Sequence, residues 1–230
     1  MQLSRVDYLR AQHVGSDRFP GIKTFLLMAG ILLFFSMAGN AVASSFHDYL
    51  EVRVENRKIE DRLRDWMERV EEHREALETS DHRQISRWRE QLQQVHFQDE
   101  RAGLLRLNAM INGDVAYRDD YSHFLKADYW ADPETVLEEG GDCEDIALLK
   151  AASLQRLNWP VERMQLLVGY LIERGKKESH AVLLVQTSEG HQLVLRSLDN
   201  EVVHPDRFPF VPLYAVSSNG VFVAKRFIAD

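Results

Sequence analysis

The apolar residues of this chain change their spacing near residue 160. Before that point they recur every three or four residues, which is the spacing of an amphipathic helix. After it, short apolar segments are separated by turn-like sequences such as "RGKKES", "SEG", "DNE" and "SNG". This order of helices followed by strands predicts an α+β fold with an antiparallel sheet in the C-terminal half.

The helical pattern runs from Ser44 to about Asn112. Its apolar stripes occupy three stretches, Phe46–Val70, Ile85–Val95 and Leu104–Ile111, and such stripes usually face a protein core. The sequence "TSDHRQ" interrupts the pattern after the first stripe and offers three N-cap residues, Thr79, Ser80 and Asp81.

A loop is predicted from Asn112 to Asp132, followed by a short helix with Asp132 as its N-cap and Pro133 at its first position. The predicted strands then follow in five segments, "RMQLLVGYLIER", "HAVLLVQT", "HQLVLRSL", "VPLYAVSS" and "VFVAKRF". Their lengths and the turns between them favour neighbouring antiparallel strands.

Residues 1–43 have the features of a secretory signal peptide. Basic residues precede the apolar run "TFLLMAGILLFFSMA", and Ala41-Val42-Ala43 then gives the small-x-small pattern of a signal peptidase site. The run is shorter than the roughly 20 residues of a membrane span, although an uncleaved inner-membrane anchor is the alternative. We therefore expect a mature domain of residues 44–230 in the periplasm.

Charge and cysteine content exclude several classes of function. The formal net charge of −8 argues against non-specific binding to nucleic acid, which requires a basic surface. A single cysteine forms no intramolecular disulfide and excludes multi-cysteine zinc sites and cysteine-ligated iron–sulfur clusters. We expect neither a nucleic-acid partner nor a small-molecule cofactor.

The single cysteine, Cys143, lies in "EEGGDCEDIALLKAASLQRL" at the start of a helix predicted for Cys143–Leu157. Asp142 is a suitable N-cap, and Asp145 can complete a capping box. The free N–H groups and the dipole of a helix N-terminus favour a thiolate there. The alternative is a small core residue, but the sequence "GGDCED" is too polar for that, so we interpret Cys143 as a reactive thiol.

A thiol nucleophile needs a general base and a residue that orients the base. His180 begins the apolar segment "HAVLLV", and Asp199 follows the next one, in "LRSLDN". Adjacent antiparallel strands could place both residues beside Cys143. Two alternatives stay open at this point, since His191 and His204 are rival bases and Asp199-Asn200 also fits an ordinary hairpin turn.

The segments "DYWADPETVLEEGGDCEDIALLKAASLQRL", "HAVLLV" and "LDN" together resemble the bacterial transglutaminase-like cysteine proteinases. The sequence "LNAMIN" at 107–112 is also similar to paired asparagines of that family, and the likeness extends from about Leu104 to Val223. The resemblance implies a papain/transglutaminase-like fold in which Cys143 is the nucleophile, His180 the base and Asp199 the orienting residue. Arg196-Ser197 departs from the family pattern because it interrupts the apolar run before "LDN".

The acidic residues around Cys143 have two interpretations. Carboxylates beside a thiol raise its pKa by charge repulsion. From the residues alone, helix capping and solvation account for them. The resemblance instead implies a calcium ion bound through Asp142 and Glu144, which would neutralise this charge and whose preference for oxygen ligands they satisfy.

The resemblance also implies the biological setting. Members of the family process a large surface adhesin in the control of biofilms, and an inner-membrane cyclic-di-GMP receptor sequesters them. The expected function is thus that of a periplasmic, calcium-dependent cysteine endopeptidase. Two alternatives remain, namely a transglutaminase-type acyltransferase with the same triad and a non-catalytic periplasmic adaptor that works through its helical half.

Overall fold

The computed structural model describes residues 52–53, 57–126 and 129–224, so the predicted signal peptide lies outside the described residues. The helices are α3 (Arg57–Thr79), α4 (Arg83–Leu92), α5 (Glu100–Asp114), α6 (Asp120–Phe124), α7 (Pro133–Glu139) and α8 (Cys143–Arg156), with short 3-10 helices at Val161–Arg163 and Pro205–Arg207. The strands are β1 (Val52–Arg53), β2 (Met164–Glu173), β3 (Lys176–Gln186), β4 (Gln192–Leu195), β5 (Val202–Val203), β6 (Phe210–Ser217) and β7 (Gly220–Val223).

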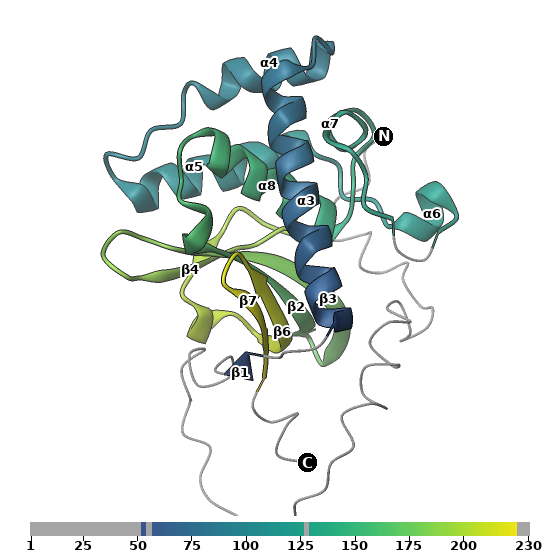
Figure 1. Ribbon diagram of the computed structural model, residues 1–230, viewed down its shortest axis with the longest axis vertical. Coiled ribbons are helices and arrows are strands. Elements are labelled where there is room, and N and C mark those ends of the chain that lie inside the picture. The colour runs from purple at the N-terminus through teal and green to yellow at the C-terminus, as the bar shows by residue number, and fades with distance from the viewer. Residues whose placement is uncertain (1–51, 54–56, 127–128, 225–230) are drawn as a thin grey trace, which may run out of the picture.

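The strands form one antiparallel sheet in the order β1-β7-β6-β2-β3-β4-β5. Figure 1 shows α3, α5 and α8 gathered on one side of this sheet. The long β2–β3 hairpin lies near its centre, with pairing from Met164↔Val185 to Glu173↔Lys176. The predicted α+β architecture is therefore confirmed.

Both faces of the central strands are buried. In β3, Ala181 and Leu183 belong to the large core cluster that includes the helices, whereas Val182 and Leu184 pack with Phe208 in a smaller cluster. Successive side chains of a strand point to opposite faces. The continuous apolar sequence of β3 thus reflects burial on two sides rather than the one-sided burial that produces alternation.

Helix α8 is the buried centre of the helical layer. Every residue from Cys143 to Leu154 is buried. It packs against α3 on one side and β3 on another, and the buried Trp88 indole of α4 donates a hydrogen bond to Ser153 Oγ at 3.1 Å. A helix covered on all sides carries apolar and small residues around its circumference. No helix among the described residues combines the length and apolar character needed to cross a membrane.

Local predictions were correct where the signal lay in adjacent residues. Helix α7 begins after Asp132, whose carboxylate accepts a hydrogen bond from Thr135 N–H at 2.9 Å, with Pro133 at the first position. The stripes of α4 and α5 are buried as expected.

Other local predictions were wrong because distant contacts decide them. The N-cap of α4 is His82 instead of Thr79, Ser80 or Asp81. The Ser80 hydroxyl instead donates to Glu134, which lies 54 positions away, and accepts from His82 N–H. Val52–Arg53, inside the predicted first helix, pairs with β7 as a strand.

The segment Asp120–Phe124, inside the predicted loop, forms helix α6, which Asp119 caps through a hydrogen bond from Ser122 N–H at 3.1 Å. Strand β3 begins at Lys176, before the predicted start at His180. Here the "RGKKES" turn is shorter than expected, because its lysines pair with the end of β2.

Two glycines bring the chain before α8 against the segment after α5. Gly141 N–H donates to Ala116 O at 3.1 Å, and Arg118 N–H donates to Gly141 O at 2.9 Å. Gly140 has φ +97° and ψ −179°, a conformation that essentially only glycine adopts. A Cβ at Gly140 would lie 2.2 Å from Ala116 O. The glycines thus permit the close backbone contact that precedes Cys143.

Replacement of Gly140 by alanine is therefore expected to lower the free energy of unfolding by about 3 kcal/mol or more, from backbone strain plus the clash with Ala116 O. Gly175→Ala is the matched control, because Gly175 also has a positive φ of 74° but open space around it, and it should cost about 1 kcal/mol. Urea denaturation measures both. Equal losses for the two variants would show that the contact with Ala116 is unimportant.

Candidate active site

Cys143 is the first residue of α8, and its side chain is 4% exposed. The predicted helix start is confirmed, because Asp142 is the N-cap and forms a capping box with Asp145. In that box Asp142 N–H donates to Asp145 Oδ2 at 3.3 Å. The helix begins at this point because the two carboxylates satisfy N–H groups that the first turn leaves without helical partners.

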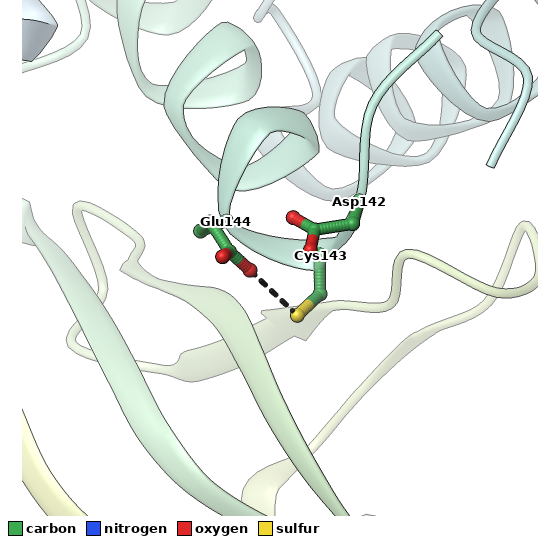
Figure 2. A group of neighbouring side chains, drawn as sticks. All are labelled: Asp142, Cys143 and Glu144. Atoms are coloured by element: carbon green, nitrogen blue, oxygen red, sulfur yellow. Dashed lines mark hydrogen bonds between the residues drawn. The ribbon is translucent and has the colours of Figure 1, made fainter. Parts of the chain in front are cut away.

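The thiol has two hydrogen-bond partners. It donates to Glu144 Oε2 at 3.0 Å, as Figure 2 shows, and it accepts from Ala181 N–H of β3 at 3.3 Å. Burial raises the pKa of Cys143 well above its ordinary value, and the charges of Glu144 and Asp142 raise it further. The repulsion that the sequence predicted is therefore present, and the Ala181 N–H opposes it only in part.

His180 directly precedes the residue whose N–H contacts the thiol. It lies in β3 opposite Gly169 of β2, and it is buried. Burial lowers the pKa of His180 to about 3, with further lowering by the cations of Lys150 and Arg196. Its imidazole is consequently neutral at physiological pH, which is the form that can accept a proton.

A β-bulge interrupts the pairing of β2 with β6 between Val168 and Gly169. A Cβ on Gly169 would lie 2.3 Å from Val211 O, so only glycine allows β6 to approach at this position. Bulges often occur beside active sites, where they change the direction of a strand. This one lies opposite His180.

Asp199 lies in the loop 196–201, which joins β4 to β5. Its Oδ1 accepts from Glu201 N–H at 2.9 Å, and its Oδ2 pairs with Arg196 Nη2 at 2.9 Å. The same Arg196 side chain pairs with Glu173 at 2.6 Å. Asp199 is therefore past the end of β4 and takes part in a partly buried ion-pair network at the end of the sheet.

The structure brings part of the predicted triad together. Cys143 and the His180–Ala181 segment are in contact through the Ala181 N–H. Among the described residues, no hydrogen bond joins the His180 ring to the thiol or to the Asp199 carboxylate, since Glu144 and Arg196 occupy those two groups. The rival bases His191 and His204 are exposed, and each pairs with a neighbouring acid of its own loop.

Acidic side chains surround the N-terminus of α8. Oxygen atoms of Asp142 and Glu144 lie within 4.8 Å of each other and of the thiol sulfur, and a second such group joins Asp142 to Asp120 and Asp145. Figure 2 shows the carboxylates of Asp142 and Glu144 on the same side of the first turn.

Burial and the neighbouring charge of Glu144 raise the pKa of Asp142 well above its ordinary value, and burial raises that of Asp145 to about 8. The buried Oδ1 of Asp142 has no hydrogen-bond partner in the part of the chain that the structure describes. An unsatisfied carboxylate oxygen beside further carboxylates fits a hard cation such as Ca²⁺.

Asp120 and the Ala181 N–H were not among the site groups predicted from the sequence. Asp120 lies 22 positions before Asp142, in a stretch predicted as a loop, and its Oδ2 accepts from Tyr129 N–H at 2.5 Å. No local pattern connects the two acids. The backbone donor at Ala181 depends on how the sheet packs against α8, so nothing in the sequence marks it.

Solved structures share this fold. LapG from Legionella pneumophila, in a calcium-bound form, aligns with a TM-score of 0.54 and 23% identity over 68% of this chain and 88% of that chain. The EGTA-treated form of the same protein aligns with a TM-score of 0.53 and 22% identity over 67% of this chain and 85% of that chain. A comparison with curated protein sequences gave no significant match.

A sequence model of one protein family, described as bacterial transglutaminase-like cysteine proteinase, matches residues 76–217. This match spans more than half of the chain and includes α8, β3 and the loop that carries Asp199. The fold and the thiol at a helix N-terminus agree with the resemblance found in the sequence. The chain belongs to the bacterial transglutaminase-like cysteine proteinases.

Proposed function

We propose that this protein is a calcium-dependent cysteine endopeptidase with Cys143 as nucleophile, His180 as general base and Asp199 as the residue that orients His180. The observation that carries the proposal is the contact of the Cys143 thiol with the backbone N–H next to His180. It places the only thiol of the chain at a helix N-terminus and against the histidine-bearing strand, within a protease family.

The proposed reaction follows from these positions. His180 takes the proton of the thiol, and the thiolate sulfur attacks the scissile carbonyl carbon. Collapse of the tetrahedral intermediate breaks the C–N bond, and the imidazolium gives its proton to the leaving amine. Water, deprotonated by His180, then hydrolyses the thioester, which releases the carboxylic acid and restores the thiol.

One hydrogen bond and one ion pair in the present arrangement have to change before this reaction. The thiol donates to Glu144 and the Asp199 carboxylate is held by Arg196, so neither group engages the imidazole. Catalytic hydrogen bonds are often incomplete in the absence of substrate. We expect the thiol to leave Glu144 and Asp199 to turn from Arg196 to His180 in the active arrangement.

Calcium accounts for the first change. Asp142 and Glu144 would hold the ion, with Asp120 and Asp145 as further acidic neighbours. A divalent cation offsets the carboxylate charge that raises the pKa of the thiol. Once the ion engages the Glu144 carboxylate, that carboxylate is a weaker acceptor for the hydrogen bond from the thiol. Support comes from the unsatisfied Asp142 Oδ1 and from the fold shared with a calcium-bound protein.

The setting is proposed from the family and from the N-terminal sequence. We infer a protein substrate, a large surface adhesin whose cleavage controls biofilm formation, and an inner-membrane cyclic-di-GMP receptor as the regulatory partner. The protein would act in the periplasm after removal of residues 1–43.

The triad is tested with three alanine variants against an N-terminal fragment of the adhesin. Cys143→Ala is expected to abolish cleavage, and His180→Ala to lower kcat by about 10⁴-fold or more, because the two act as a unit. Asp199→Ala is expected to be severe but incomplete. Gel analysis and mass spectrometry of the products measure cleavage, and a fluorescent primary amine in the assay distinguishes hydrolysis from acyl transfer.

His191→Ala is the matched control for the base, since His191 is exposed on the loop that follows β3. It should retain full activity. Loss of activity in His191→Ala together with an active His180→Ala would contradict the assignment of the base. Amine incorporation in place of new carboxyl termini would instead favour the acyltransferase alternative.

Calcium dependence is tested by chelation. EGTA should suppress cleavage, and added Ca²⁺ should restore it better than Mg²⁺, which prefers a smaller and more hydrated octahedral site. Glu144→Gln should weaken calcium binding in titration calorimetry, because it removes one ligand charge with little change of shape. Glu162→Gln, at an exposed glutamate outside the acidic group, should bind calcium as the wild type does.

Asp142→Ala is less informative, because the loss of an N-cap alone costs roughly 0.5–2 kcal/mol of stability. The calcium proposal fails if the protein remains fully active in EGTA and calorimetry detects no binding. The acidic residues would then serve as caps of α8.

Export is tested on the protein made in its host. Mass spectrometry of the periplasmic fraction should find a mature N-terminus at or near Ser44, because signal peptidase cleaves after small residues such as Ala43. Intact residues 1–43 in the membrane fraction would indicate an anchor instead.

A further inference from the structure

The loop that carries Asp199 depends on side chains from the helical layer. Strands β4 and β5 pair only through Val194↔Val203 and Leu195↔Val202, so the loop 196–201 leaves the sheet. Within it, Arg196 N–H donates to Glu201 O at 3.3 Å. The loop lies outside the β4–β5 ladder, and buried carbonyl groups outside a ladder need donors from elsewhere.

Two buried asparagines of α5 provide such donors. Asn112 Nδ2 donates to Arg196 O at 2.7 Å and also to the Asp199 carbonyl. Asn108 Nδ2, one helical turn earlier, donates to Glu201 O at 3.2 Å and more weakly to the Asp199 carbonyl at 3.5 Å. Asn112 thus holds the main chain before Asp199, and Asn108 holds it after Asp199. Both amides also contact the carbonyl of Asp199 itself.

A third donor comes from the helix that carries the nucleophile. Lys150 is fully buried, and its ammonium group donates to Arg196 O at 3.0 Å. It follows Cys143 by seven positions, which is about two turns of helix, so the two side chains leave α8 on the same side. One rigid helix therefore contacts His180–Ala181 at its first residue and the Asp199 loop about 10 Å further along its axis.

We propose that Asn108, Asn112 and Lys150 are positioning residues that fix the Asp199 loop relative to Cys143 and His180. The inference rests on the proposed role of Asp199 in the triad. In the hydrogen bonds described above, the three side chains hold backbone carbonyl groups and leave the Asp199 carboxylate able to exchange Arg196 for His180. Without them, the two β4–β5 residue pairs and the Arg196–Glu173 ion pair join the loop to the sheet, and neither contact holds the main chain at Asp199.

The competing explanation is that the asparagines and the lysine merely satisfy buried carbonyl groups and stabilise the fold. A double-mutant cycle with Asp199→Ala separates the two, because alanine at 199 keeps the backbone carbonyl that Asn112 holds and removes the carboxylate with its contacts to Glu201 N–H and Arg196. The stabilising contribution of Asn112 persists in that background. A contribution to catalysis that acts through the carboxylate disappears.

The experiment uses a fluorogenic peptide selected for cleavage by the wild-type protein. Asn112→Ala is expected to lower kcat by roughly 10–100-fold, the effect of a misplaced catalytic group, with KM changed by less than about twofold. In the Asp199→Ala background the same substitution should change kcat by less than about twofold, while its effect on the melting temperature stays the same. Asn108→Ala and Lys150→Met should show the same pattern as Asn112→Ala. The loss of kcat should be smaller for Asn108→Ala than for Lys150→Met.

Arg101→Gln is the matched control. Arg101 also belongs to α5 and donates to a carbonyl just beyond the loop, that of Val202 at 3.2 Å, so its substitution should leave kcat unchanged. Equal losses of kcat for Asn112→Ala in both backgrounds would overturn the positioning role and leave the triad intact. Full activity of Asp199→Ala alone would overturn the triad itself, and this inference with it.

Discussion

Burial of the first turn of α8 is the constraint on which the site depends. The Cys143 thiol and the carboxylates of Asp142, Glu144 and Asp145 lie together there. Burial disfavours the charged forms of Asp142, Cys143 and Asp145. The pKa values of Cys143, Asp142 and Asp145 are raised as a result. The positive end of the helix dipole acts in the opposite direction, but it does not overcome burial and like charge together.

The same burial explains the protonation states of His180 and of the Cys143 thiol. His180 is neutral because it is buried near the cations of Lys150 and Arg196, and the thiol remains protonated beside Glu144. A thiol and an imidazole that are both neutral form a resting site. A cation bound at the carboxylates, as proposed above, would lower the cost of ionising the thiol.

The helical layer and the sheet meet through polar contacts as well as through the apolar core. Asn112 and Lys150 reach from two helices to carbonyl groups of one loop of the sheet. Hydrogen bonds of this kind fix an orientation that apolar packing alone leaves loose, because they depend on both distance and angle. The position of Asp199 therefore depends on α5 and α8 as much as on the strands that precede it.

Features that depend on neighbouring residues could be predicted from the sequence. Helix α8 and its capping box, the Asp132 cap of α7 and the succession of strands each follow from patterns a few positions long, and the motif around Cys143 indicated the family. Three features follow from the tertiary structure alone: Glu144 accepts a hydrogen bond from the thiol, Arg196 holds Asp199, and Asp120 joins the acidic group. These contacts depend on rotamers and on segments that fold together from distant parts of the chain, and no local spacing encodes them.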